Sequence, residues 1–339
     1  MRLLAASGLG LLLAATSISP GAAQEPFYKG KTVRLVISVG VAGGFGEYAR
    51  TLAEHLGRHI AGQPHIIVQS MPGAGGLLAA THLYAQAPQD GTTIGIVNAT
   101  VPLAPLWGSK GARFETMKFN WLGALDRSDG VCTFWHTSPA KTWSDLLQHE
   151  VTVGSIGAGS PMEVYALVLD RLFGAKIRVV GGYKAGSDID LAMERREIDG
   201  RCGTHLTTYK SLHPNWVAER KFVVPVIIAE KRRADYPDTP SVMEFVKDES
   251  TRQKLELLMV SQNLDRPVLA PPGVPAERIK ELRNAFDATM NDPAFLAEIA
   301  RKNLQVEPTS GAEMTAVLAK AFSVPAGVVD SLRDIMAPR

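Results

Sequence analysis

Two stretches of the chain repeat one order of elements: an apolar run, a glycine-rich turn and an amphipathic run, twice over, and then a third apolar run. The first covers residues 33–99 and the second covers residues 151–204. Matched positions keep a nearly constant separation: Gly43 and Gly159, Gly75 and Gly186, Asp90 and Asp199. Each stretch therefore predicts a βαβαβ unit with a parallel sheet and right-handed crossovers. Two such units predict two similar α/β lobes.

The glycine-rich turns predict an anion site. In open α/β sheets, ligands bind beyond the carboxyl ends of the strands, where these turns lie. The first N–H groups of a helix lack internal partners, and the helix dipole leaves that end partly positive. Glycine lets a ligand approach those N–H groups closely. One such turn is explained by chain reversal alone, but four at matched positions favour a binding site.

The turns do not fit a nucleotide. "EPFYKGKT" lacks the first glycine of a phosphate-binding loop, and "GAGGLL" and "GAGSPM" both fail the G-x-G-x-x-G pattern. A small carboxylate fits better, because two backbone N–H groups can bind it without arginine. G-x-S-x-G, H-E-x-x-H and C-x-x-C are absent from the sequence, so we predict neither catalytic residues nor a cofactor.

The candidate ligand-binding residues lie in the turns and at the ends of the strands. They are Gly43, Gly44, Phe45, Gly46, Glu47, Gly73, Ala74, Gly75, Gly76, Asn98, Gly157, Ala158, Gly159, Ser160, Tyr183, Lys184, Gly186 and His205. Three of these residues have an alternative role that does not involve a ligand. Ser160 and Glu163 have the spacing of a capping box, Lys184 is in a loop where lysine is usually solvated, and His205 need not face the cleft.

Composition narrows the class further. A length of 339 residues favours two lobes, and the net charge of +2 without a basic cluster argues against nucleic acid. The only cysteines, Cys132 and Cys202, predict a disulfide, with two buried free thiols as the alternative. His55 and His59 are one helical turn apart, but a polar helix face explains them better, so we predict no metal.

The N-terminus predicts export. Residues 1–23 have an early cation, an apolar stretch and small residues that suit cleavage after Ala23, which is the pattern of a signal peptide. No later run of about 18 apolar residues indicates a membrane span. We therefore expect a soluble periplasmic protein.

Three motifs in fixed order carry a resemblance to a known family. "GKTVRLVISVGVAGGFGEYAR", "PGAGGLLAATHLYAQAPQDGTTIG" and "PPGVPAERIKELRNAFDATMNDPAF" resemble the Bug-type solute-binding receptors of tripartite tricarboxylate transporters. The resemblance runs from about residue 27 to the C-terminus. It implies a two-lobe periplasmic binding protein of type II, with a mixed sheet flanked by helices in each lobe and a ligand cleft between them. We place lobe 1 at residues 24–124 and 230–339, and lobe 2 at residues 125–229.

One position departs from the family pattern. In the family, the first loop usually reads A-G-G-x-x-D. Alignment on Ala49 and Arg50 places Gly46 at the position of that acid, with Glu47 next. The resemblance implies a monomer that binds a small carboxylate and passes it to membrane transporter subunits. Two alternatives remain open at this stage: a receptor that presents its ligand to a membrane signalling protein, and an enzyme of the same two-lobe shape.

Overall fold

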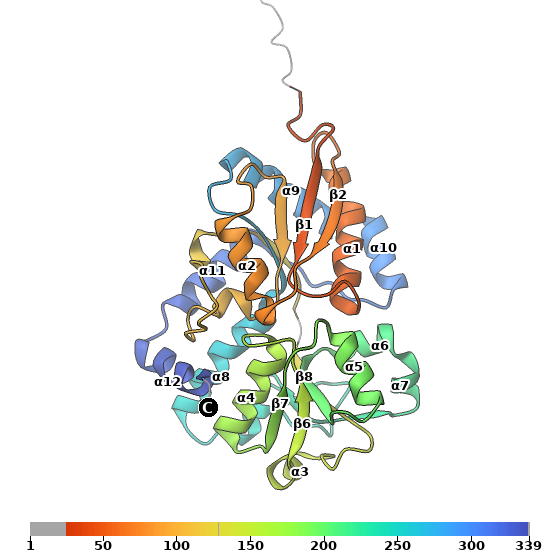
Figure 1. Cartoon of the computed structure of the whole chain (residues 1–339), viewed down its shortest axis with the longest axis vertical. Helices are drawn as coiled ribbons and strands as arrows, with labels where there is room; N and C mark the ends of the chain where they lie inside the picture. Colours follow the sequence, from red (N-terminus) through yellow and green to blue (C-terminus); the bar gives the residue numbers. More distant parts are fainter. Residues whose placement is uncertain (1–24, 128, 338–339) are drawn as a thin grey trace, which may run out of the picture.

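Each of the two lobes is built on a β-sheet flanked by helices (Figure 1). The computed structural model describes residues 25–127 and 129–337. The predicted signal peptide, residues 1–23, lies outside the described residues. The two-lobe α/β architecture with mixed sheets confirms the predicted fold class.

The first lobe contains a six-stranded sheet in the order β11-β4-β10-β3-β1-β2. The strands are β1 (Thr32–Ile37), β2 (His65–Ser70), β3 (Thr93–Ile96), β4 (Asn120–Asp126), β10 (Asp265–Ala270) and β11 (Thr309–Ser310). β1 runs parallel to β2 and β3, as the first βαβαβ unit predicts. β10 runs antiparallel to both β3 and β4, which makes the sheet mixed.

The second lobe contains a five-stranded sheet in the order β7-β6-β8-β5-β9. The strands are β5 (Gly130–Trp135), β6 (Val151–Gly154), β7 (Ile177–Val180), β8 (Gly200–Thr204) and β9 (Phe222–Ile228). β6 runs parallel to β7 and β8, so the second predicted unit is also confirmed. β5 runs antiparallel to β8 and β9.

Helices cover both faces of each sheet. The α-helices are α1 (Gly44–Leu56), α2 (Leu77–Ala85), α3 (Trp143–Gln148), α4 (Pro161–Phe173), α5 (Gly186–Glu194), α6 (Leu206–Leu212), α7 (Pro214–Ala218), α8 (Glu249–Met259), α9 (Ala276–Met290), α10 (Pro293–Arg301), α11 (Gly311–Phe322) and α12 (Ala326–Met336). The 3₁₀ turns are η1 (Gly57–His59), η2 (Ala74–Gly76), η3 (Val101–Leu103), η4 (Thr116–Lys118), η5 (Val242–Phe245) and η6 (Val260–Leu264).

Alternation along β1 explains how the first sheet is covered on both sides. Val33, Leu35 and Ile37 belong to one hydrophobic cluster with residues of α1, α9 and α10. Val36 points to the other face and joins a cluster with residues of α2 and α11. Successive side chains of a strand point to opposite faces, so a continuous apolar run is buried between two layers of helices.

Local sequence signals fix where several helices begin. Ser310 and Glu313 form a complete capping box at α11, as their spacing predicts. Ser160 caps α4 by accepting a hydrogen bond from the Glu163 N–H, and Pro161 occupies the first turn. The Glu163 carboxylate does not complete that box, because it accepts a hydrogen bond from the Ser155 hydroxyl at 3.2 Å instead.

The last helix joins the two lobes. α9, α10 and α11 return to the first lobe, as expected, whereas α12 packs against α4 and α8 (Figure 1).

The chain leaves the first sheet after Asp126 and the second after Ile228. We propose that the lobes divide near these points, close to the predicted boundaries.

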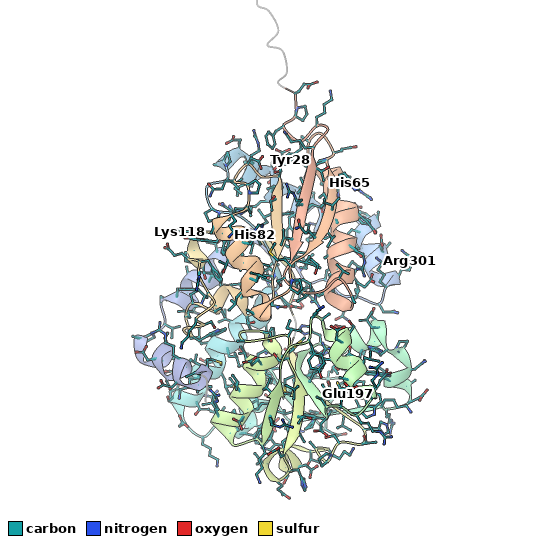
Figure 2. The ribbon with its side chains drawn as sticks, in the orientation of Figure 1. Tyr28, His65, His82, Lys118, Glu197 and Arg301 are labelled. Carbon is teal, nitrogen blue, oxygen red and sulfur yellow. A yellow bond between two sulfur atoms is a disulfide. The ribbon has the colours of Figure 1, made fainter. Side chains whose placement is uncertain are left out.

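No single helix in residues 25–127 and 129–337 is long and apolar enough to cross a membrane; α11 and α12 pass by length and composition only as a pair bent by 91°. Charged side chains gather on the outer surface: Lys118 and Arg301 project from opposite flanks of the first lobe in Figure 2. A few charged residues lie instead at the centre of the molecule, where the lobes meet.

Candidate functional site

A cavity of about 80 Å³ lies between the lobes. The first lobe contributes the β1–α1 turn, the end of β3 and the start of β10, and the second lobe contributes the N-termini of α4 and α5 and the end of β8. Six of the candidate residues line it: Gly43, Gly44, Phe45, Asn98, Gly186 and His205. The cavity therefore lies at the carboxyl ends of the parallel strands, where the glycine-rich turns are expected to bind a ligand.

Other candidate residues lie beside the cavity, where two glycine-rich turns touch each other. The Gly75 N–H donates to the Ile156 carbonyl at 3.3 Å, across the lobes. The Thr100 hydroxyl donates to the Gly159 carbonyl at 2.5 Å. A Cβ atom at Gly75 would lie 2.4 Å from the Ala158 carbonyl oxygen. This contact involves the turns of Gly73, Ala74, Gly75 and Gly76 and of Gly157, Ala158, Gly159 and Ser160, none of which lines the cavity.

The remaining candidates have structural partners outside the cavity. Gly46 packs so tightly that a Cβ atom there would lie 1.8 Å from the Val41 carbonyl oxygen. Glu47 forms ion pairs with Arg50 and, at 3.6 Å, with Lys302. Tyr183 and Lys184 are in the β7–α5 turn, where the Lys184 carbonyl accepts a hydrogen bond from the Gly40 N–H of the other lobe at 3.0 Å. Their roles in ligand binding stay predictions.

The helix pair α1–α10 buries His55. Its Nε2 lies 2.8 Å from a Glu298 carboxylate oxygen, and that carboxylate also pairs with Lys302 at 2.9 Å. His55 is 4% exposed, so it lies within a helix contact and not on the polar surface that the sequence suggested. Glu54 completes a group of three possible metal ligands there. Lys302, which pairs with Glu298, already balances part of the charge of that carboxylate.

Arg201 is a cavity residue that the sequence did not single out. It is 5% exposed, and its Nη1 donates to Asp190 at 2.6 Å and to the Gly186 carbonyl at 2.9 Å. The other Asp190 oxygen lies 3.2 Å from Nε2 of His213. A buried charge needs such partners, because transfer out of water is otherwise very costly.

Arg266 is the corresponding residue of the first lobe. It is 3% exposed and pairs through Nη1 with Asp265, while Asp126 lies 3.5 Å away. Its guanidinium stacks on the Tyr48 ring, with Cζ 3.8 Å from the ring centre. His205 of the second lobe reaches the same group, because its Nε2 lies 3.3 Å from Asp265. His205 thus connects the second lobe to the buried group of the first lobe at the cavity wall.

One buried acid of this group, Asp126, has a strongly raised pKa. Burial raises the pKa of Asp126 to about 6, and the negative charge of Asp265 adds to the rise while Arg266 opposes it. Asp126 also accepts hydrogen bonds from the N–H groups of Arg127 and Glu307, at 3.0 and 3.2 Å. This carboxyl therefore titrates near neutral pH.

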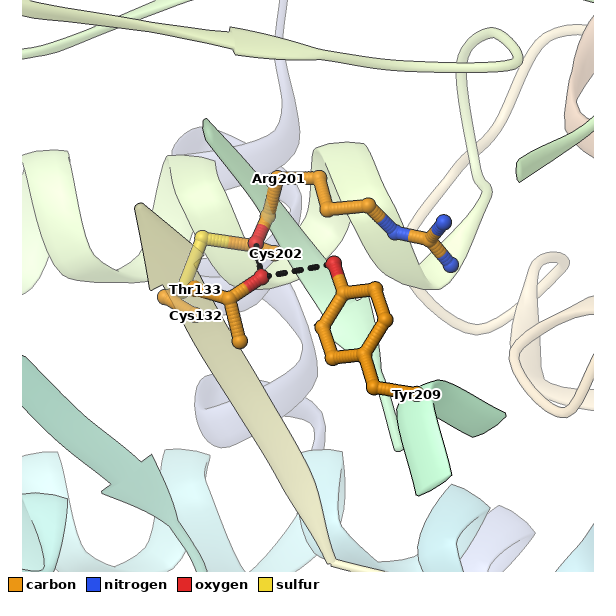
Figure 3. The surroundings of a disulfide bond; sticks show 5 residues. All are labelled: Cys132, Thr133, Arg201, Cys202 and Tyr209. Carbon is orange, nitrogen blue, oxygen red and sulfur yellow. Dashed lines mark hydrogen bonds between the residues drawn. A yellow bond between two sulfur atoms is a disulfide. The ribbon is translucent and has the colours of Figure 1, made fainter. Parts of the chain in front are cut away.

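The residue that follows Arg201 in the chain forms a disulfide. Cys132 on β5 and Cys202 on β8 are bonded with an S–S distance of 1.99 Å. Figure 3 shows the Arg201 guanidinium directed away from the disulfide. In the same view the Thr133 hydroxyl and the Tyr209 hydroxyl are hydrogen-bonded at 2.9 Å. The disulfide fixes the strand that carries Arg201 to its neighbour.

Comparison with known proteins places this architecture in a family. The model of the tripartite tricarboxylate transporter family receptor matches residues 48–322. The chain belongs to this family. A relative from Cupriavidus necator, the "UPF0065 protein in gbd 5′region", is 24% identical over 316 residues, which cover 89% of this chain and 88% of the relative.

Solved structures of periplasmic binding proteins share the fold of this tripartite tricarboxylate receptor. The periplasmic binding protein BugD is similar with a TM-score of 0.69 and 18% identity, covering 91% of this chain and 97% of BugD. MatC from Rhodopseudomonas palustris with bound malate is similar with a TM-score of 0.68 and 20% identity, covering 91% and 99% of the two chains. The family is one of transporter receptors, so this chain is a solute-binding receptor and not an enzyme.

Proposed function

We propose that this receptor binds a small organic carboxylate in the cavity between its lobes and delivers it to the membrane subunits of a tripartite transporter. The observation that carries this proposal is a cavity between the lobes lined by two buried arginines, Arg201 and Arg266, in a chain that belongs to the receptor family. MatC with bound malate and an R. palustris protein with adipate, both similar in fold, support a carboxylate ligand. We propose further that the receptor is a monomer exported by its N-terminal signal peptide.

A ligand between two lobes is enclosed when the lobes close. Closure removes water from the cavity, so each hydrogen bond from the protein to the carboxylate becomes stronger. Hinge closure of this kind is one of the standard movements of binding proteins. The interlobe hydrogen bonds at Gly75, Thr100 and Lys184 describe such a closed arrangement.

Binding and closure are tested on the mature chain without its signal peptide. We expect one or more acids in a panel of mono- and dicarboxylates, aromatic acids included, to raise the melting temperature and to bind with 1:1 stoichiometry in calorimetry. Small-angle scattering should then show a smaller radius of gyration with the acid than without it. Failure of every acid to bind would reject the proposed function, and binding without a change in radius would reject closure.

A further inference from the structure

Two arginines, one from each lobe, face the same cavity. Arg201 stands on β8 of the second lobe and Arg266 on β10 of the first, and both line the cavity. Each pairs with an aspartate through its Nη1: Arg201 with Asp190, and Arg266 with Asp265. These acids hold the guanidinium groups in place and balance their charge.

The opposite edge of each guanidinium has no partner among the described residues. Nε of Arg201 and Nε of Arg266 are buried and make no hydrogen bond there. Among the described residues, both side chains donate their hydrogen bonds from Nη1, and none leaves from Nη2 on the same edge as Nε. Buried polar groups are nearly always hydrogen-bonded, so each exception calls for an explanation. A parallel pair of N–H donors matches the two oxygens of a carboxylate.

An unpaired Nε alone does not mark a binding site. Arg171 and Arg278 also have a buried Nε without a partner in the described part of the chain, and neither lines the cavity. Arg171 instead donates through Nη1 to backbone carbonyls of Ile335 and Ala337. What distinguishes Arg201 and Arg266 is that both line one cavity, from opposite lobes.

We propose that Arg201 and Arg266 are the ligand-binding cations of this receptor, and that its ligand is a short organic acid with acceptor groups at two positions. A carboxylate accepts two hydrogen bonds from one guanidinium edge, and a second carboxylate or a keto oxygen accepts from the other. This assignment rests on the proposed function and specifies its ligand. It replaces backbone N–H groups as the principal carboxylate donors with two side chains.

The cavity limits the length of the acid. A cavity needs roughly 10–15 Å³ for one enclosed water molecule, and this one measures about 80 Å³. It therefore has room for only a few water-sized groups, which favours a short acid such as malonate or pyruvate over a longer one such as adipate. Because one arginine belongs to each lobe, such a ligand bridges the lobes and stabilises their closed arrangement.

Three variants test the two arginines. Arg201→Lys and Arg266→Lys keep the positive charge beside each aspartate but remove the paired donors. Gly186→Ala leaves Arg201 in the chain but displaces it, because the added Cβ atom would lie 2.8 Å from Nη1 and 2.9 Å from Nη2. Arg171→Lys is the matched control, since it changes an arginine with the same unpaired Nε outside the cavity. Circular dichroism confirms that each variant is folded.

Calorimetric titrations use malonate, pyruvate, propionate and adipate. We expect malonate or pyruvate to bind the unaltered receptor about 10-fold or more tightly than propionate, which lacks the second acceptor group. Arg201→Lys, Arg266→Lys and Gly186→Ala should each weaken that binding by about 10- to 100-fold, while Arg171→Lys binds as the unaltered receptor does.

Failure of this inference differs from failure of the proposed function. If folded variants bind malonate or pyruvate as tightly as the unaltered receptor, or if only one arginine matters, the two-arginine assignment is wrong and the carboxylate receptor remains. If the receptor binds only longer or aromatic acids of the wider panel, the short ligand is wrong. If it binds no acid at all, both proposals are wrong.

Discussion

At the scale of single residues, the centre of the first lobe contains a buried group of charges. Arg266 lies between Asp265 and Asp126 and stacks on Tyr48, and all three charged residues are at most 5% exposed. If both acids were charged, the single arginine would balance only one of them. Burial must therefore disfavour the charged form of the other acid. Burial raises the pKa of Asp126 to about 6, so the charged form of this acid is disfavoured.

The protonation of Asp126 makes stability depend on pH. An aspartate in the unfolded chain has a pKa of about 3.9, whereas in the folded protein the pKa of Asp126 is raised to about 6. Between these values the folded protein holds a proton that the unfolded chain has released, so raising the pH through this window lowers the free energy of unfolding. We expect this contribution to fall by about 2 kcal/mol between pH 4 and pH 7.

Asp126→Asn isolates this contribution. The amide oxygen of asparagine can still accept the hydrogen bonds from Arg127 and Glu307, but the side chain no longer titrates. Denaturant unfolding of both proteins should therefore show the variant gaining about 2 kcal/mol relative to the unaltered protein between pH 4 and pH 7. A difference that stays constant over this range would contradict the assignment.

The sequence predicts part of the cavity lining at this scale. The β1–α1 turn was predicted from its glycines, and Gly43, Gly44 and Phe45 do line the cavity. Arg201 and Arg266 were missed, because an arginine in a strand has the same local pattern whether it faces water or a cavity. Their buried charges are paired with Asp190, Asp265 and Asp126, and the ion pair between Arg266 and Asp126 joins residues far apart in the chain. Only folding brings that pair together.

At the scale of elements, the disulfide fastens β5 to β8. It joins residues separated by 70 positions, and β8 carries Arg201 directly before Cys202. The two strands also pair in the sheet, with a register shift between Val131 and Thr133. Because a bulge weakens the ladder at that point, a covalent link there helps to hold the alignment of the two strands.

Removing the disulfide should destabilise the protein. In the chain-entropy treatment, closing a loop of this length is worth about 4 kcal/mol. We expect the double variant Cys132→Ala with Cys202→Ala to lose up to about 4 kcal/mol of unfolding free energy in denaturant titrations. A reductant should lower the stability of the unaltered protein and leave the variant unchanged. Two freely alkylated thiols in periplasm-purified protein would contradict the bond itself.

The order of elements was largely predictable, and the mixing of strand directions was only partly so. The two βαβαβ units follow from local periodicity and glycine-rich turns, and their parallel pairing follows from the crossover rule. β10 and β4 instead pair antiparallel after long connections. Nothing local in "DRPVLA" specifies that partner. The packing of α12 on α4 and α8 was likewise not predicted, because an amphipathic pattern does not specify which element covers the apolar face of the helix.

At the scale of the whole molecule, two backbone turns form the contact between the lobes beside the cavity. Gly75 has φ of 66° and lies against the Gly157–Ser160 turn. The contact is close because neither turn has side chains in the way, so the glycines that predicted a ligand site also permit the lobes to meet. We therefore expect closure and binding to be linked through Gly75: a change that keeps the turns apart should also weaken the contacts of the proposed ligand.

Gly75→Ala separates closure from folding. The added Cβ atom would lie 2.4 Å from the Ala158 carbonyl oxygen, and it would also place alanine at a positive φ. Gly174→Ala is the matched control: its φ is 75°, but nothing lies within 4 Å of the added atom. Both variants should lose about 1 kcal/mol of unfolding free energy through backbone strain. Only Gly75→Ala should also bind the acid about 10-fold or more weakly and show a larger radius of gyration in scattering at a saturating acid concentration. Equal affinities for the two variants would mean that the turns meet without contributing to closure.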